Sequence, residues 1–403
     1  MTASHAESPL PQHGSAPSRT ASFACRGLEA SWRAKLLPRP EMNAALFEAV
    51  ARRDLPAGAF GACDAWREPF GILVQGLRDD ARLNPLGLSM AHGQIVDALK
   101  ARIRAQALWR AHPEILDRQV VAPVIILGPM RSGTTRLQRL LACDPRFAHT
   151  RMFESLAPIP ARGRALKARA SLAALKLFNP AVAAIHPMRP NDPEEEFGLF
   201  SFSFGSAQFE AQWRVPGFTS WWESADTRML YREFRSLLQT IAWSRGEPAD
   251  RPWLLKAPQF MQDLDTVLDV FPDARLICLD RDLDRIVGSA SSLVWHQMRI
   301  QSDFVDPAWI GREWLRKTLL RKRRAAKARA ARPDVPQIDV SYAAIDQDWR
   351  AEIRRIYDFL GLELTSDIAR RMAAYVTNAR SHLGHAYTLE QFGLTRETVL
   401  ADA

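Results

Sequence analysis

A glycine-rich loop behind an apolar run is the part of this sequence whose residue types and spacing could do chemistry. The run Val124–Leu127 leads into Gly128, Pro129, Met130, Arg131, Ser132, Gly133, Thr134 and Thr135. A strand, a loop and a helix N-terminus in this order direct backbone N–H groups at an anion. Hydroxyls within the loop can donate further hydrogen bonds to it, those of Ser132, Thr134 and Thr135. The segment therefore predicts a phosphate-binding loop.

This loop differs from the nucleoside triphosphate version at one position. In the Walker A pattern, G-x-x-x-x-G-K-[ST], a lysine reaches the β- and γ-phosphates. Thr134 stands at the lysine position here, and the positive charge comes earlier, at Arg131. The loop keeps its anion-binding backbone but lacks the residue that contacts a γ-phosphate.

Two later strand ends carry cations. Lys256 ends the short run that begins at Trp253, and Arg281 follows the apolar run Arg275–Leu279. An arginine at a strand end can hold a phosphate through two parallel hydrogen bonds. A helix that begins near Asp282 places Ser289 within about two turns, where its hydroxyl can face the same phosphate.

A Walker B strand offers a rival interpretation. The residues Leu276–Asp280 are four apolar residues followed by an aspartate, which suggests an ATPase or a kinase that binds Mg²⁺. Thr134 in place of lysine argues against this interpretation, as does the lack of a compact acidic cluster at the loop in the sequence.

The elements that must position these residues form repeated strand–helix units. Strands are expected at 121–127, 253–256, 275–279 and 337–341, and helices at 134–142, 259–270, 284–298, 348–360 and 365–376. This alternation predicts an α/β fold, a P-loop-type, mostly parallel sheet flanked by helices, with helical insertions. We expect a disordered tail over 1–26, a helical N-terminal region over 27–117, and the α/β domain over 118–403.

Composition is that of a basic globular protein. The 403 residues carry a net charge of +9, with 25% charged and 47% hydrophobic residues, which suits anionic ligands. No nucleic-acid-binding signature, signal peptide or long apolar segment is visible, and the four cysteines form no C-x-x-C pair. We therefore expect a cytoplasmic protein that does not bind nucleic acid, with weak membrane-surface contact left open.

Taken together and in order, these motifs resemble sulfotransferases that use 3′-phosphoadenosine 5′-phosphosulfate (PAPS), in the bacterial branch related to tyrosylprotein sulfotransferases. The loop resembles their 5′-phosphosulfate loop, Trp253–Pro258 resembles their L-K-S-P strand end, and Phe271–Ser289 resembles their 3′-phosphate motif. The resemblance implies PAPS as co-substrate and no metal. It implies that the loop binds the phosphosulfate, with Gly133 among its residues, and that Arg281 and Ser289 bind the 3′-phosphate.

The same resemblance implies the catalytic groups. Arg131 and Lys256 would stabilise the charge that develops during transfer, and Arg380 in the C-terminal segment would contact the cofactor. Glu154 is the first candidate for the general base, because related enzymes carry a glutamate just past the first strand–helix unit. The other candidates for the base are His186, Glu194, Glu195 and Glu196.

Two positions depart from the family pattern. Phe260 stands where the family strand K-S-P-x-H has its histidine, and Asp280 stands where the family has the histidine of H-R-D-P. An aspartate beside a phosphate-binding arginine is electrostatically unfavourable unless it points away. Besides a phosphotransferase, a degenerate member that acts as a binding protein stays open.

The acceptor is not identified by the sequence. A small molecule, glycan, lipid or peptide would all fit, and the oligomeric state is open. The stretch 197–222 is rich in Phe and Trp, as expected for core packing or for an apolar wall of the acceptor site. Residues 316–332 contain nine Lys or Arg and no acid, which predicts a solvated basic helix or, as the alternative, a docking surface for an anionic partner or membrane.

Overall fold

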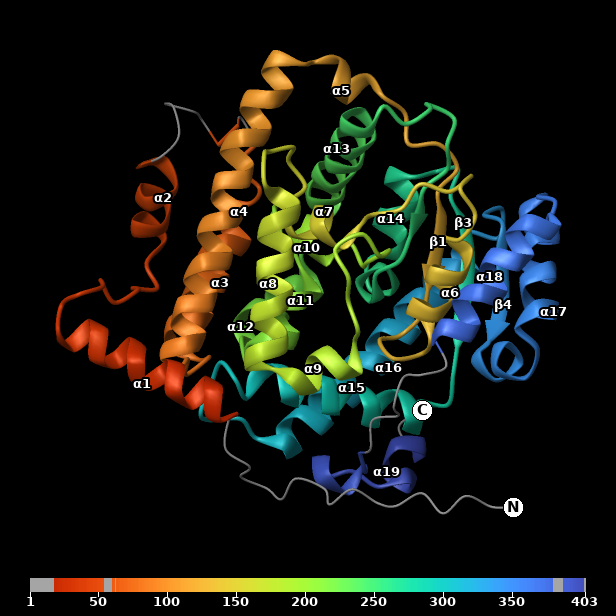
Figure 1. Cartoon of the computed structure of the whole chain (residues 1–403). Coiled ribbons are helices and arrows are strands. Elements are labelled where there is room, and N and C mark those ends of the chain that lie inside the picture. Colours follow the sequence, from red (N-terminus) through yellow and green to blue (C-terminus); the bar gives the residue numbers. More distant parts are fainter. Residues whose placement is uncertain (1–17, 54–59, 62, 380–386, 402–403) are drawn as a thin grey trace.

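A parallel β-sheet lies at the centre of the computed structural model, which describes residues 18–53, 60–61, 63–379 and 387–401. Its strands, within this described part, are β1 (Val124–Leu127), β2 (Leu254–Leu255), β3 (Arg275–Asp280) and β4 (Gln337–Ser341). Their order is β2-β1-β3-β4, and every neighbouring pair is parallel. The expected α/β fold is confirmed, and β1 delivers the loop at an interior position of the sheet (Figure 1).

Each face of the sheet is covered by helices. Ile125 and Leu127 of β1 pack into a core with residues of α13 and α14, whereas Val124 and Ile126 pack into a second core with α6 and α17. Burial on both faces explains why the strands are continuous apolar runs rather than alternating ones. The helices after β1 are α6 (Thr134–Leu141), α7 (Met152–Leu156), α8 (Arg164–Phe178), α9 (Pro180–Ile185), α10 (Phe197–Ser201), α11 (Ala207–Gln212), α12 (Pro216–Ser224) and α13 (Arg228–Arg245).

The C-terminal half continues the strand–helix alternation. It contains the 3₁₀-helix η1 (Pro258–Met261), α14 (Leu264–Val270), α15 (Leu283–Met298), α16 (Pro307–Ala331), α17 (Tyr342–Leu360), α18 (Ser366–Ala379), η2 (Glu390–Phe392) and α19 (Arg396–Ala401). The helix expected over 259–270 is divided into η1 and α14. The division falls at Asp263, whose buried carboxylate accepts a hydrogen bond of 3.1 Å from the hydroxyl of Tyr231.

Helices also build the N-terminal region, as expected. They are α1 (Arg19–Arg33), α2 (Ala44–Arg53), α3 (Arg67–Asp79), α4 (Pro85–Ala111) and α5 (Glu114–Asp117). The expectation of a disordered tail over 1–26 is corrected for residues 19–26, which belong to α1. Ser18 caps this helix by accepting a hydrogen bond of 3.2 Å from the backbone N–H of Ala21.

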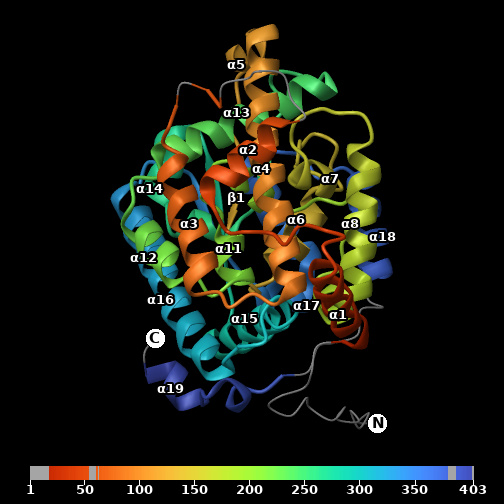
Figure 2. The same ribbon diagram turned by 90° about the vertical axis from the view of Figure 1, so that its left-hand side faces the viewer.

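The N-terminal helices share a core with the helical insertion. Residues of α2, α3 and α4 pack with Phe204, Trp213, Phe218 and Trp222, and α3 and α12 lie side by side in both views (Figures 1 and 2). Much of the aromatic stretch is therefore core. Across the described ranges, no helix is both long enough and apolar enough to cross a membrane.

Candidate functional site

Two residues of the loop hold it in a conformation that L-residues rarely adopt. Arg131 has a φ of 73° and Gly133 a φ of 100°, so both lie in the left-handed region. A Cβ on Gly133 would come within 2.4 Å of the Tyr342 ring, and a Cβ on Gly128 within 2.7 Å of the Ser132 Oγ. Glycine is required at both positions by space, and at Gly133 also by backbone conformation.

Arg131 is the centre of a cluster of groups from three elements. Its Nε donates a hydrogen bond of 3.0 Å to the Oγ of Ser289 on α15, and its backbone carbonyl accepts one of 3.1 Å from Arg281. The guanidinium of Arg281 lies 4.2 Å from the centre of the Tyr342 ring. The structure thus brings Arg131, which the sequence assigned to the phosphosulfate loop, next to Arg281 and Ser289, which it assigned to the 3′-phosphate.

The guanidinium of Arg131 is largely withdrawn from solvent. Burial lowers its pKa from the ordinary value, and the negative charge of Glu195 opposes that effect. Arginine side chains are not deprotonated in proteins, so the group keeps its positive charge. A desolvated, charged arginine beside an anion-binding loop can stabilise negative charge more strongly than an exposed one.

Ser132 faces into the loop rather than out of it. The side chain is fully buried, and its Oγ donates a hydrogen bond of 2.8 Å to the carbonyl of Pro129. The prediction that this hydroxyl contacts a phosphate is therefore corrected: it is already used to close the loop. Thr134 and Thr135, by contrast, both line the adjoining cavity.

Lys256 reaches the loop from the end of β2. Its Nζ donates a hydrogen bond of 3.1 Å to Thr135 Oγ1 and forms an ion pair with Glu195, and its side chain is 1% exposed. The backbone N–H of Lys256 donates a hydrogen bond of 2.9 Å to Glu196. The buried ammonium therefore lies between the loop and a carboxylate that lines the cavity.

The three consecutive glutamates have different surroundings. Burial alone would raise the pKa of Glu194, but His186 at 3.0 Å, together with Lys256 and the backbone N–H of Glu195, outweighs this effect and lowers the pKa to about 2. Burial raises the pKa of Glu196 to about 8, which keeps this group mostly protonated at neutral pH. Glu195 is the member that pairs with Lys256. A general base must be an ionised carboxylate that lies near the transferred group. Glu195, which contacts Lys256 beside the loop, best meets the requirement of position.

Glu154 lies in a different environment from the one that the sequence suggested. Its carboxylate is fully buried, accepts a hydrogen bond of 3.0 Å from the Arg151 backbone N–H at the start of α7, and pairs with Arg245 of α13. It does not line the cavity at the loop. The structure therefore corrects the choice of Glu154 as the base, because its carboxylate faces Arg245 and lies away from the cavity that an acceptor would enter.

The two departures from the family pattern have simple structural explanations. Asp280 points away from the loop and pairs with Lys322 at 3.0 Å, with 66% of its side chain exposed. Phe260 is buried in the core, where its ring packs against Phe200 and Tyr231. Neither residue disturbs the charges at the loop. The predicted contact by Arg380 falls outside the described residues.

Two aromatic residues at the site were not assigned there by the sequence. Tyr342 follows β4 directly and packs between Gly133 and Arg281. Tyr387 packs against Gly288 and donates a hydrogen bond of 3.0 Å to the carbonyl of Arg285. The signal for Tyr342 was its place at the end of a predicted strand, since the carboxyl ends of parallel strands form the ligand-binding edge of such sheets.

A cavity of about 730 Å³ opens beside the loop. Polar groups of the site line it at the loop, namely Arg131, Thr135, Glu195, Arg281 and Tyr342. Its other walls come from α4, α8, α10, α11 and α15 and include Phe197, Phe202 and Phe209. The aromatic stretch thus supplies both core and cavity wall. Among the residues with described positions, no group of three or more His, Cys, Asp or Glu could hold a metal ion.

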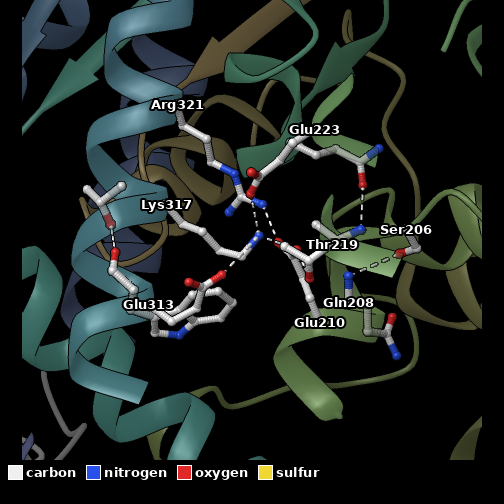
Figure 3. A network of polar contacts seen from close by, with 12 residues as sticks. Ser206, Gln208, Glu210, Thr219, Glu223, Glu313, Lys317 and Arg321 are labelled. Carbon is white, nitrogen blue, oxygen red and sulfur yellow. Dashed lines mark hydrogen bonds and ion pairs between the residues drawn. The ribbon is translucent and has the colours of Figure 1, made fainter. Parts of the chain in front are cut away.

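A buried network of charges fixes one wall of this cavity. Glu210 of α11 pairs with Lys317 and Arg321 of α16, and Lys317 also lies 3.2 Å from Glu223 of α12 (Figure 3). Thr219 donates a hydrogen bond of 3.2 Å to the same Glu210 carboxylate. The prediction that residues 316–332 form a solvated basic helix is therefore wrong for Lys317 and Arg321, which are buried.

The network acts on the cavity through α11. Phe209 and Gln212, on either side of Glu210 in sequence, both line the cavity, so the helix presents them to the cavity while Glu210 ties it to α16. Removing one partner of a buried ion pair strongly destabilises a protein, whereas an exposed ion pair contributes little to stability. The buried pairs of Glu210 therefore hold α11 to α16 more firmly than exposed pairs would.

Comparison with known proteins shows similarity to the sulfotransferase family. The sequence pattern of the sulfotransferase family matches residues 123–367. The crystal structure of sulfotransferase STF1 from Mycobacterium tuberculosis H37Rv matches with a TM-score of 0.79 and 27% sequence identity, over 90% of this chain and 99% of that one. Sulfotransferase STF9 from Mycobacterium avium shares the fold, with a TM-score of 0.78, 24% identity, and coverage of 91% and 96%. No curated protein matches the chain in sequence. Because the family pattern spans more than half of the chain and includes the loop, Lys256, Arg281 and Ser289, this protein belongs to the sulfotransferase family.

Proposed function

We propose that this protein transfers a sulfuryl group from PAPS to a hydroxyl or amine of an acceptor. The observation that carries the proposal is the meeting of Arg131, Arg281 and Ser289 at a loop that lacks the Walker A lysine. PAPS carries a phosphosulfate and a separate 3′-phosphate, so it needs two neighbouring anion sites. The loop supports the first site, and Arg281 with Ser289 supports the second.

The hydroxyls of the site are poised to donate to anions. Ser289 Oγ accepts a hydrogen bond from Arg131, and Thr135 Oγ1 accepts one from Lys256. Each hydroxyl therefore keeps its own hydrogen for a phosphate or sulfate oxygen. The ring of Tyr342 packs where a side chain at Gly133 would lie, and the N–H groups at the start of α6 suit a bound phosphate.

Two cations would act on the charge that develops during transfer. PAPS supplies an activated sulfuryl group, whose loss leaves negative charge on the 5′-phosphate. Arg131 belongs to the loop and Lys256 contacts it through Thr135. Lys256 is buried and Arg131 is half-buried, so water screens their fixed charges less than it would at the surface. No metal is needed for this arrangement, because the positive charge comes from the chain itself.

Glu195 is our proposed general base. Its carboxylate lines the cavity next to the loop and contacts Lys256, so an acceptor hydroxyl that approaches the loop meets it. Removing the acceptor proton raises the nucleophilicity of the oxygen, an effect typically worth about 10²–10⁴-fold. Glu194 and His186, whose side chains are 3.0 Å apart, line the same cavity and can orient the acceptor.

The Walker B interpretation receives little support from the position of Asp280. In Mg²⁺-dependent NTPases this aspartate faces the phosphate loop, whereas Asp280 is exposed and paired with Lys322. A kinase-like role would need another carboxylate near Thr134.

A pair of matched variants tests the assignment of the base. Glu195→Gln should lower the rate of bisphosphate formation from PAPS by about 10²-fold or more, and it should retain binding of adenosine 3′,5′-bisphosphate. Glu154→Gln removes the charge from a buried ion pair and should lower the free energy of unfolding, while the remaining folded enzyme turns over normally. The opposite pattern, a slow Glu154→Gln enzyme and a normal Glu195→Gln enzyme, would restore Glu154 as the base.

A further inference from the structure

The cavity beside the loop is polar at one side and apolar at the others. Charged groups cluster where Arg131, Glu195 and Arg281 line it. Away from the loop, each wall contributes apolar side chains, represented by Met90 of α4, Leu175 of α8, Phe209 of α11 and Leu293 of α15. A ligand that fills this space must therefore present its reactive group to the loop and an apolar body to the helices.

Helix α8 contributes a stripe of apolar side chains to the wall of the cavity. Over its 15 residues, only Ala168 is buried. Leu172, Leu175 and Phe178 extend the same helical stripe and line the cavity without being buried in protein. A neighbouring element normally covers the apolar stripe of a helix. Here the stripe residues are half-buried and line the cavity, so a ligand in the cavity would cover the part that stays exposed.

The ion pair that joins α4 to α8 lies at the outer surface, whereas Arg164 at the start of α8 is a half-buried charge on these walls. Asp97 of α4 and Lys167 of α8 pair at 2.6 Å, with 51% and 60% of their side chains exposed. Neutral groups such as Gln208 and Gln212 are the polar residues nearer the interior. The Oε1 of Gln212 is buried and has no hydrogen-bond partner among the described residues, so it can accept one bond from a ligand. A polyol would leave most of its hydroxyls unpaired against such walls.

We propose that the acceptor is an amphipathic alcohol or phenol with a long apolar body, which lies between α4, α8 and α11 while its hydroxyl meets Glu195. This inference rests on the proposed sulfotransferase function. In the reaction, the acceptor oxygen forms a bond to sulfur, and the bond between sulfur and the bridging oxygen of the donor breaks. The acceptor proton goes to Glu195, and adenosine 3′,5′-bisphosphate leaves with the bonding electrons.

A homologous series of acceptors tests the proposal. We would measure transfer from radiolabelled PAPS to 4-alkylphenols, from 4-ethylphenol to 4-nonylphenol. Burying a methylene stabilises a complex by about 0.8 kcal/mol, which corresponds to about fourfold in kcat/KM per added carbon. We expect this rise to continue until the cavity is filled and then to level off. A flat series, or faster transfer to sugars than to every alkylphenol, would overturn the proposal.

Two leucines on one helix provide a matched comparison. Leu175 lines the cavity, whereas Leu177 is 56% exposed on the outside of α8. Leu175→Trp should shift the best acceptor to a shorter alkyl chain, and Leu177→Trp should leave the series unchanged. Leu172→Phe, a smaller change on the same stripe, should shift the series in the same direction if Leu175→Trp fails to fold. Equal profiles for the inward and outward variants would contradict the placement of the apolar body.

Binding of adenosine 3′,5′-bisphosphate distinguishes a failure of the proposed sulfotransferase function from a failure of the proposed acceptor class. The variants on α8 should bind it as the parent protein does, because they do not touch the loop. A parent protein that binds no bisphosphate would refute the sulfotransferase function itself. A protein that binds bisphosphate but shows no preference for chain length would refute the acceptor class alone.

Discussion

The replacement of Arg281 by alanine tests the 3′-phosphate site most sharply. Arg281 does two things in the structure: it donates a hydrogen bond to the carbonyl of Arg131 and it stacks on Tyr342. Arg281→Ala therefore removes a proposed phosphate ligand and also loosens the loop. These two effects can be separated, because only the first depends on whether the nucleotide has a 3′-phosphate.

The expected size of the effect follows from the type of hydrogen bond that alanine cannot make. A hydrogen bond to a charged group contributes about 1.5–3 kcal/mol, so the affinity for adenosine 3′,5′-bisphosphate should fall about 10- to 150-fold. Adenosine 5′-monophosphate lacks the 3′-phosphate, so its affinity should fall only by the part that is due to the loosened loop. The difference between the two decreases is the coupling between Arg281 and the 3′-phosphate.

Isothermal titration calorimetry of both nucleotides gives this coupling directly. Arg285→Ala is the matched control, because Arg285 is an exposed arginine one turn along the same segment. Its carbonyl accepts the hydrogen bond from Tyr387, and alanine keeps that carbonyl. An equal decrease in affinity for both nucleotides in Arg281→Ala would show that Arg281 only supports the loop, and the assignment of the 3′-phosphate site would be refuted.

Three further substitutions test the packing and electrostatics around the site. Gly133→Ala must place a Cβ at a φ of 100° and within 2.4 Å of the Tyr342 ring, so calorimetry should show clearly weaker bisphosphate binding. The control is Gly163→Ala, at a φ of 77° with no atom within 4 Å of the added Cβ. It should lower the free energy of unfolding by only about 1–2 kcal/mol and leave bisphosphate binding unchanged. Glu210→Gln removes the charge that faces Lys317 and Arg321 and should lower the free energy of unfolding in urea by about 3–5 kcal/mol, whereas a decrease below about 1 kcal/mol would mean that the network is not held by charge. Glu196→Gln tests linkage to pH: because the pKa of Glu196 rises from 4.5 to about 8, its contribution to stability is complete below about pH 4.5 and is lost as the pH rises toward 8. The urea stability of Glu196→Gln should therefore fall less than that of the parent between pH 5 and 8, and parallel profiles would contradict the raised pKa.

The loop and the strands were predictable because their signals are local. The apolar run 124–127 is buried on both faces of the sheet, and the glycines that follow it are required by backbone conformation or space. Lys256 and Arg281 could be placed because a residue after a parallel strand lies at one edge of the sheet whatever the rest of the chain does. These features depend on a few neighbouring residues, so the sequence shows them directly.

The choice of base could not be predicted because it depends on distant partners. Glu154 is neutralised by Arg245, which is 91 positions away in sequence. Glu195 meets Lys256 across 61 positions. Three consecutive glutamates differ only in what surrounds them, and those surroundings come from other elements.

The basic run of α16 shows the same limit. By composition it resembles a solvated helix, yet Lys317 and Arg321 are buried because Glu210, more than 100 positions earlier, lies opposite them.

The start of α17 also differs from the prediction. A helix was expected from residue 348, and the Asp348 side chain does accept hydrogen bonds from the N–H groups of Arg350 and Ala351 as an N-cap would. The chain is nevertheless already helical from Tyr342, with a kink at Asp348.

The most direct test of the central claim is a calorimetric comparison of two nucleotides on the unmodified protein. If the site around Arg131, Arg281 and Ser289 binds PAPS, adenosine 3′,5′-bisphosphate should bind at least tenfold more tightly than ATP, with or without Mg²⁺. If ATP with Mg²⁺ binds as tightly as the bisphosphate or more tightly, the site is a triphosphate site, and the proposed sulfuryl transfer from PAPS is contradicted.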